Sequence, residues 1–153
     1  MELLSFTSII VRLILATIIG GLIGSERGRH GSAAGLRTHI LVCVGAAITS
    51  LTGVYLIQCA GISSDATRLA AQVVSGIGFL GAGIILVRNS SVITGLTTAA
   101  GMWATAAIGI AVGYGFYLGA IFAAVICFFT VTFLSRLEKN SKNITTLYVE
   151  LSN

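Results

Sequence analysis

Five apolar runs, each close to the length of a membrane-crossing helix, constrain this chain more than any other feature. A transmembrane helix needs roughly 20 mostly apolar residues, and the runs cover approximately Phe6–Gly24, Ile40–Ala60, Leu69–Val87, Val92–Gly113 and Phe116–Leu134. In lipid each segment has to satisfy its own backbone hydrogen bonds, and the runs are too long and uniform to be barrel strands. The sequence therefore predicts an all-α integral membrane protein, a bundle of about five transmembrane helices within residues 1–137.

The composition excludes several other classes of protein. Charged residues make up 9% of the chain and its mean hydropathy is +0.99, whereas about 25% charged residues is usual in a soluble domain. The basic residues flank apolar runs instead of forming a solvated face, so we expect no nucleic-acid partner. Cys43, Cys59 and Cys127 lie in or beside apolar runs without a CxxC pair. We expect them to be buried small side chains, with no disulfide, metal site or cofactor.

The basic residues also predict an orientation in the membrane. If the N-terminus lies outside, one basic residue of the connections, Arg68, falls outside, and seven fall inside: Arg27, Arg29, Arg37, Arg88, Arg136, Lys139 and Lys142. Positive charge accumulates in cytoplasmic loops. The sequence therefore predicts an outside N-terminus and a cytoplasmic C-terminus.

The segment Ser25–His39 is a short charged island between the first two runs. We expect it to be a cytoplasmic loop whose candidate site residues are Glu26, Arg27, Arg37, Thr38 and His39. Clustered arginine is first a topology signal, but ionisable groups at membrane depth are often functional. We expect Glu26 and Arg37 to form an ion pair that closes this end of the bundle. If they act separately, Arg37 is better interpreted as an anion or partner contact, and Glu26 as a cation or proton site.

Arg12 is a charged residue inside the first apolar run. It could extend to the outer headgroups, but it shares a helical ridge with Gly20 and Gly24, a spacing typical of contacts between membrane helices. We therefore expect Arg12 to face protein, with both glycines at helix contacts.

The third run combines a polar face with the densest group of glycines. Arg68, Gln72 and Ser75 share one helical face, preceded by Asp65, and we expect this face to point into the bundle. The glycines expected to pack against other helices are Gly76, Gly78, Gly81 and Gly83. Their match to G-x-G-x-x-G is not a nucleotide signature, because no strand precedes it. A locally unwound helix that lines a cavity is the alternative interpretation.

The composition changes after Arg136. Residues 138–143 resemble a polar linker, and residues 144–151 alternate like a half-buried strand. A single strand cannot fold alone, so we expect residues 138–153 to be a linker and the first strand of a truncated cytoplasmic domain.

Three stretches of the chain resemble successive signatures of the MgtC/SapB family of bacterial inner-membrane proteins. They are GGLIGSERGRHGSAAGLRTHILVCVGAAI, AAQVVSGIGFLGAGIIL and GLTTAAGMWATAAIGIAVG, and together they cover about Arg12–Gly113. The resemblance implies a protein of about five spans in the inner membrane, often followed by a cytoplasmic ACT-like domain. It adds Thr97, Thr98 and Trp103 of the third signature to the candidate site residues. The virulence branch of the family tends to have Asn and Cys where Thr97 and Ala104 stand, which separates this chain from that branch.

The resemblance also implies a role in stress responses such as growth in low magnesium or acid, with restraint of ATP synthase or altered phosphate uptake. We expect a regulator that binds other membrane proteins, assembled as a homo-oligomer, with a dimer favoured. A transporter or channel for a small ion, formed by an oligomer, is the alternative, and a purely structural bundle is a third. We do not expect an enzyme, because the sequence offers no nucleophile–base pair or phosphate-binding loop.

Overall fold

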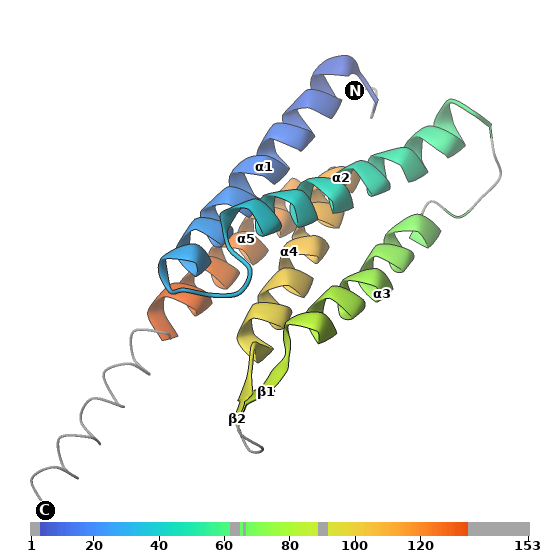
Figure 1. Cartoon of the computed structure of the whole chain (residues 1–153). Coiled ribbons are helices and arrows are strands. Elements are labelled where there is room, and N and C mark those ends of the chain that lie inside the picture. Colours follow the sequence, from blue (N-terminus) through green and yellow to red (C-terminus); the bar gives the residue numbers. More distant parts are fainter. Residues whose placement is uncertain (1–3, 62–64, 66, 89–91, 135–153) are drawn as a thin grey trace, which may run out of the picture.

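The computed structural model describes residues 4–61, 65, 67–88 and 92–134 of the 153-residue chain (Figure 1). These residues form five helices and one short hairpin: α1 (Phe6–Arg29), α2 (Leu36–Gln58), α3 (Thr67–Ile84), β1 (Leu86–Arg88), β2 (Val92–Thr94), α4 (Leu96–Tyr114) and α5 (Tyr117–Phe129), which continues into a π-helical turn (Thr130–Leu134). The prediction of a helical membrane protein is confirmed. Helices α1 to α4 are long and apolar enough to cross a membrane, whereas α5 is a shorter apolar helix.

Helix α4 is the centre of the bundle, because it contacts each of the other four helices. Helix α1 packs mainly on α2, while α3 packs chiefly on α4 and lies at the edge (Figure 1). Helix α5 buries Ala120 alone among its 13 residues, and its exposed side chains include Leu118, Phe122 and Phe129.

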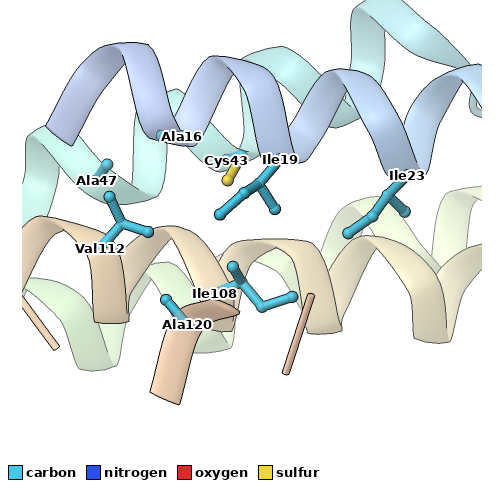
Figure 2. Packing of buried hydrophobic residues seen from close by; sticks show 8 residues of the cluster. All are labelled: Ala16, Ile19, Ile23, Cys43, Ala47, Ile108, Val112 and Ala120. Carbon is cyan, nitrogen blue, oxygen red and sulfur yellow. The ribbon is translucent and has the colours of Figure 1, made fainter. Parts of the chain in front are cut away.

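The main apolar core lies where α1, α2, α4 and α5 meet. Figure 2 shows its buried residues, which are Ala16, Ile19, Ile23, Cys43, Ala47, Ile108, Val112 and Ala120. Half of them are alanine or cysteine, and such small side chains let helix backbones approach closely without a bulky layer between them. The core therefore depends on backbone proximity more than on large side chains.

Glycines allow α2 to approach both α1 and α4 closely. A Cβ placed on Gly20 would lie 2.7 Å from the His39 carbonyl oxygen, and one on Gly24 would lie 2.8 Å from the His39 Cβ. Gly109 and Gly113 of α4 similarly meet the backbone of α2 at Cys43 and Ala47. The predicted packing role of Gly20 and Gly24 is confirmed, and α2 is held on both sides by glycine.

The helix ends near the charged segment differ from those expected. Helix α1 continues to Arg29 and α2 begins at Leu36, so Glu26, Arg27 and the residues 37–39 are helical and do not lie in a loop. Gly20, Gly24 and Gly28 lie within α1 without ending it. The chain turns at Gly31, whose φ of 67° suits a residue without a side chain. At about 1.5 Å per residue, the 24 residues of α1 span about 36 Å, more than the roughly 30 Å hydrocarbon layer.

The connection between the third and fourth runs is also different. Both runs were expected to continue as helix to Val87 and from Val92, but these residues form an antiparallel hairpin in which Val87 pairs with Ile93. Gly95, with a φ of 94°, then starts α4. The predicted linker and strand of residues 138–153 lie outside the described residues.

Candidate functional site

One end of the bundle collects the charged residues of the first two helices apart from Arg12, namely Glu26, Arg27, Arg29 and Arg37, and we call it the Arg27 end. The Arg27 side chain of α1 is 7% exposed. One of its terminal nitrogens, Nη2, donates a hydrogen bond of 3.0 Å to the hydroxyl of Thr98, in the first turn of α4. Residues from two of the predicted motifs, far apart in the sequence, therefore meet inside the protein.

His39 of α2 is fully buried at the same end. Its Nδ1 lies 2.9 Å from the Gly35 carbonyl oxygen, and because a carbonyl can only accept, Nδ1 carries a proton and donates. The neutral ring then leaves Nε2 as an acceptor. Gly24 and Gly20 of α1 press against His39 and its backbone, which fixes the position of the ring, and the charge of Arg27 is near enough to act on it.

The predicted ion pair between Glu26 and Arg37 is wrong. Glu26 is buried, but its carboxylate oxygens lie 3.7 Å from Arg29 Nη1 and 3.7 Å from His30 Nδ1. Arg37 is exposed. The reason is that residues three and four positions further along the same helix face Glu26, and α1 continues far enough to provide them. Pairs between residues three or four positions apart on a helix contribute about 0.2–0.5 kcal/mol.

Arg12 occupies the other end of the bundle and faces protein, as predicted. It is 3% exposed. Its Nη1 donates a 2.7 Å hydrogen bond to the Gly113 carbonyl, and its Nε donates one of 3.0 Å to the Tyr117 hydroxyl. The guanidinium thus ties α1 to the last turn of α4 and to the start of α5. A cation is favoured at this position because it lies at the negative end of the α4 dipole.

The polar face of α3 does not point into the bundle, contrary to the prediction. Arg68, Gln72 and Ser75 are all exposed, as are most residues of this helix. The helix buries Ala70, Ile77 and Gly81 instead. These apolar and small side chains pack better on α4, which leaves the polar face outward.

The glycines of α3 divide in the same way. Gly81 contacts α4, since a Cβ placed there would lie 3.4 Å from the Ala99 Cβ, but Cβ atoms on Gly76, Gly78 and Gly83 would meet nothing within 4 Å. The described helices therefore give these three glycines no packing partner, contrary to the prediction. Because α3 is helical throughout Thr67–Ile84, the alternative of an unwound helix is also wrong.

Asp65 precedes α3 and acts locally. Its carboxylate accepts hydrogen bonds from the Thr67 hydroxyl, at 2.7 Å, and from the Thr67 amide, at 2.8 Å. The side-chain hydrogen bond from Thr67, followed by the backbone one, lowers the pKa of Asp65 below its ordinary value. Asp65 therefore orders the start of α3, and its carboxylate is exposed to solvent.

A groove of about 450 Å³ runs between α2 and α3, and the predicted residues Arg37 and Thr38 line it together with Gly45, Thr49 and Leu80. Thr97 and Trp103 of α4 are exposed. Among the cysteines, Cys43 is buried and Cys127 is partly buried, but Cys59 is exposed, because it follows the last turn of α2.

Two residues of these sites were not singled out from the sequence. Tyr117 is the partner of Arg12. The sequence feature that could have indicated this contact is a tyrosine at the start of the fifth run, on the same predicted side of the membrane as Arg12. Gly101 lies beside the His39 ring, because a Cβ placed on it would be 3.8 Å from His39 Nε2. Its spacing within the fourth run indicated a small helix face but no neighbour.

The model of the MgtC family matches residues 13–140. The chain belongs to the MgtC family. It is 48% identical to the Escherichia coli K12 protein named "Putative magnesium transporter YhiD" over 120 residues, which are 76% of this chain and 55% of the relative. No solved structure gives a significant match.

Two other members of the MgtC family show the same partial coverage. Protein MgtC of Salmonella typhimurium is 44% identical over 118 residues, or 76% of this chain and 48% of the relative. Protein SapB of Bacillus subtilis is 38% identical over 130 residues, or 82% of this chain and 56% of the relative. The chain thus spans about half the length of these relatives.

Proposed function

We propose that this chain is the membrane part of an inner-membrane protein that regulates other membrane proteins by binding them within the bilayer. The observation that supports this proposal is the outward face of α3. Gln72 and Ser75 are exposed there, although a side-chain amide in hydrocarbon requires a hydrogen-bonding partner. A helix from another protein would supply that partner.

The backbone shape of α3 suits such a contact. Small residues recur along the exposed side at Ala71, Ser75, Gly78 and Ala82, three or four positions apart. A stripe of this kind allows two membrane helices to approach closely. A second copy of the chain would occupy this face in a homodimer, and a target such as ATP synthase, to which the family resemblance points, would compete for it.

The interior of the bundle favours binding over transport of a divalent cation. The buried charged residues of the described helices are Arg12, Glu26 and Arg27, which together carry a net positive charge. Such an interior repels Mg²⁺, whose preferred ligands are oxygen atoms, carboxylates among them. The glycine contacts of α2 with α1 and α4 leave little space between these helices.

A small-ion transporter is the second candidate, favoured by the printed name of the Escherichia coli relative. Flux into liposomes that contain the purified protein separates the two functions, with Mg²⁺, protons and phosphate each tested. A regulator gives the same flux as protein-free liposomes. Specific uptake of any of these solutes would replace the regulator with the transporter.

The regulatory activity is measured in inverted membrane vesicles from a bacterium that carries one of these relatives, after its own gene for that relative has been deleted. The present chain is then produced in the same cells. We expect the chain to lower the rate of ATP synthesis when magnesium is limiting, and Gln72→Leu to abolish this effect. Thr52→Leu, at an exposed hydroxyl of α2, is the matched control and should keep it. Equal activity of both variants would contradict binding through α3.

The proposed orientation places the N-terminus outside and the Arg27 end in the cytoplasm, in line with the distribution of basic residues. Cys59 provides a native probe, because it is exposed at the opposite end of α2 from His39. A membrane-impermeant maleimide should label Cys59 in intact spheroplasts. Labelling that requires permeabilised membranes would reverse the orientation.

A further inference from the structure

Two buried polar atoms at the Arg27 end have no hydrogen-bond partner among the residues that the structure describes. They are Arg27 Nε and His39 Nε2, on side chains that are 7% and 0% exposed. Burying a polar group without a partner is costly, and Arg27 has no carboxylate partner in the part of the chain that the structure describes. The guanidinium is therefore a buried cation whose charge and hydrogen bonds are both incompletely satisfied.

The direction of α4 makes this position more unusual. Arg12 of α1 contacts the C-terminal end of α4, where the helix dipole favours a cation. Arg27 instead donates to Thr98 in the first turn of α4, where the helix dipole is positive. The start of α2 is also close, because Gly35 and Leu36 contact Gly24 of α1. The N-caps of both helices are glycines without a capping side chain. Two positive helix ends and an arginine therefore converge, and such a place attracts an anion.

Gly101 leaves space at the same point. A Cβ placed on it would contact only one atom of another residue within 4 Å, His39 Nε2, at 3.8 Å. A side chain at residue 101 would therefore project beside the unpartnered imidazole nitrogen. The glycine keeps this volume free of protein atoms.

We propose that a small inorganic anion the size of chloride binds at the Arg27 end, between Arg27, His39 and Thr98. The Arg27 Nε–H and the Thr98 hydroxyl donate to the anion. Because neutral His39 presents an acceptor at Nε2, the ring takes up one proton from water when the anion binds, and Nε2–H becomes the third donor. One anion and one proton enter together, so the site gains no net charge.

The surroundings of His39 explain why the proton and the anion depend on each other. Helix α1 places the positive Arg27 beside the ring, and its only buried carboxylate among the described residues, Glu26, faces Arg29 and His30 instead. Helix α4 contributes the neutral Thr98, and Arg37 of α2 is exposed. Without an anion, a second positive charge beside Arg27 is disfavoured. By linkage, the affinity for the anion falls tenfold for each unit of pH over the range in which His39 is neutral when free and protonated when bound.

The test is a chloride titration followed by nitrogen NMR of the two histidines of the chain. The protein is labelled with ¹⁵N-histidine and purified in maltoside micelles with gluconate as the anion. At a pH where the free ring is neutral, added chloride should move the His39 signals to those of a protonated ring, with tenfold weaker binding per pH unit. His30, whose Nδ1 is 2.9 Å from the Glu26 carbonyl oxygen at the helix end, is the internal control and should not respond to chloride.

Gly101→Ala places a methyl group in the proposed anion volume at ordinary contact distance, and it should abolish the chloride response while the protein remains folded. Gly45→Ala is the matched control, because a Cβ on Gly45 of α2 meets nothing within 4 Å, and it should bind chloride normally. Thr98→Val should weaken chloride binding about tenfold, and it decides the question if Gly101→Ala does not fold. An unchanged His39 signal in chloride, a response that survives Gly101→Ala, or a response only to added phosphatidylglycerol would overturn the proposal.

Discussion

The close contact between α1 and α2 at Gly24 predicts how an added methyl group changes the stability of the protein. Gly24 and Gly45 are both glycines inside helices, and each can be replaced by alanine. A Cβ on Gly24 would lie 2.8 Å from both the His39 Cβ and the Leu36 Cα, whereas a Cβ on Gly45 would meet nothing within 4 Å. The same added methyl group is therefore expected to have opposite effects on stability at the two positions.

The expected change in the free energy of unfolding has two contributions, helix propensity and overpacking. Alanine is favoured over glycine in a helix by about 1 kcal/mol, so Gly45→Ala should raise the free energy of unfolding by about 0.5–1 kcal/mol. At Gly24 the helices would have to separate by roughly half an ångström to restore a contact of about 3.4 Å, and overpacking of this kind costs about 1–3 kcal/mol. We therefore expect Gly24→Ala to be less stable than Gly45→Ala by about 1–3 kcal/mol.

The assay is equilibrium unfolding in mixed micelles of maltoside and dodecyl sulfate, followed by far-ultraviolet circular dichroism. Both variants are compared with the unmodified protein at the same micelle composition. Equal stabilities of Gly24→Ala and Gly45→Ala would show that the α1–α2 contact is looser than the structure describes. A stabilising Gly24→Ala would refute the packing argument entirely.

Two further predictions concern charged side chains, and both use double-mutant cycles in the same unfolding assay. Arg12→Met and Tyr117→Phe should be coupled by about 0.5–2 kcal/mol, because each removes one side of the 3.0 Å hydrogen bond between α1 and α5; additive effects would contradict that bond. Glu26→Gln and Arg37→Gln should instead be additive to within about 0.5 kcal/mol, because the two side chains do not pair, and a larger coupling would restore the ion pair that the structure rejects.

Much of the fold could be predicted from the sequence, because the apolar runs are long and few residues interrupt them. The ends of the helices could not. Glu26 and Arg27 are polar, but helix formation depends on backbone hydrogen bonds, and these continue until the chain turns at Gly31. The hairpin between α3 and α4 was missed because Val87 and Ile93 are as suitable for a membrane helix as for a strand.

The candidate site shows the same limit more clearly. The sequence indicated that Arg27, His39 and Thr98 belong to important segments, but it could not show that they meet, since they lie on three different helices. It also identified the polar face of α3 but predicted the wrong direction for it, into the bundle. A helical pattern identifies which residues share a face, whereas the partner of that face depends on how the whole bundle packs. Here Gln72 and Ser75 face away from their own chain.

The most direct test of the proposed regulator asks what covers α3 in a native membrane. Phe79 is 82% exposed and follows the polar face by one helical turn, and Phe122 of α5 is 66% exposed. Each is replaced in turn by photoreactive p-benzoylphenylalanine, and the cells are irradiated. The account predicts that residue 79 crosslinks to protein, either a second copy or a target, whereas residue 122 crosslinks only to lipid. Lipid adducts alone at residue 79 would contradict the claim that α3 is a protein-binding face.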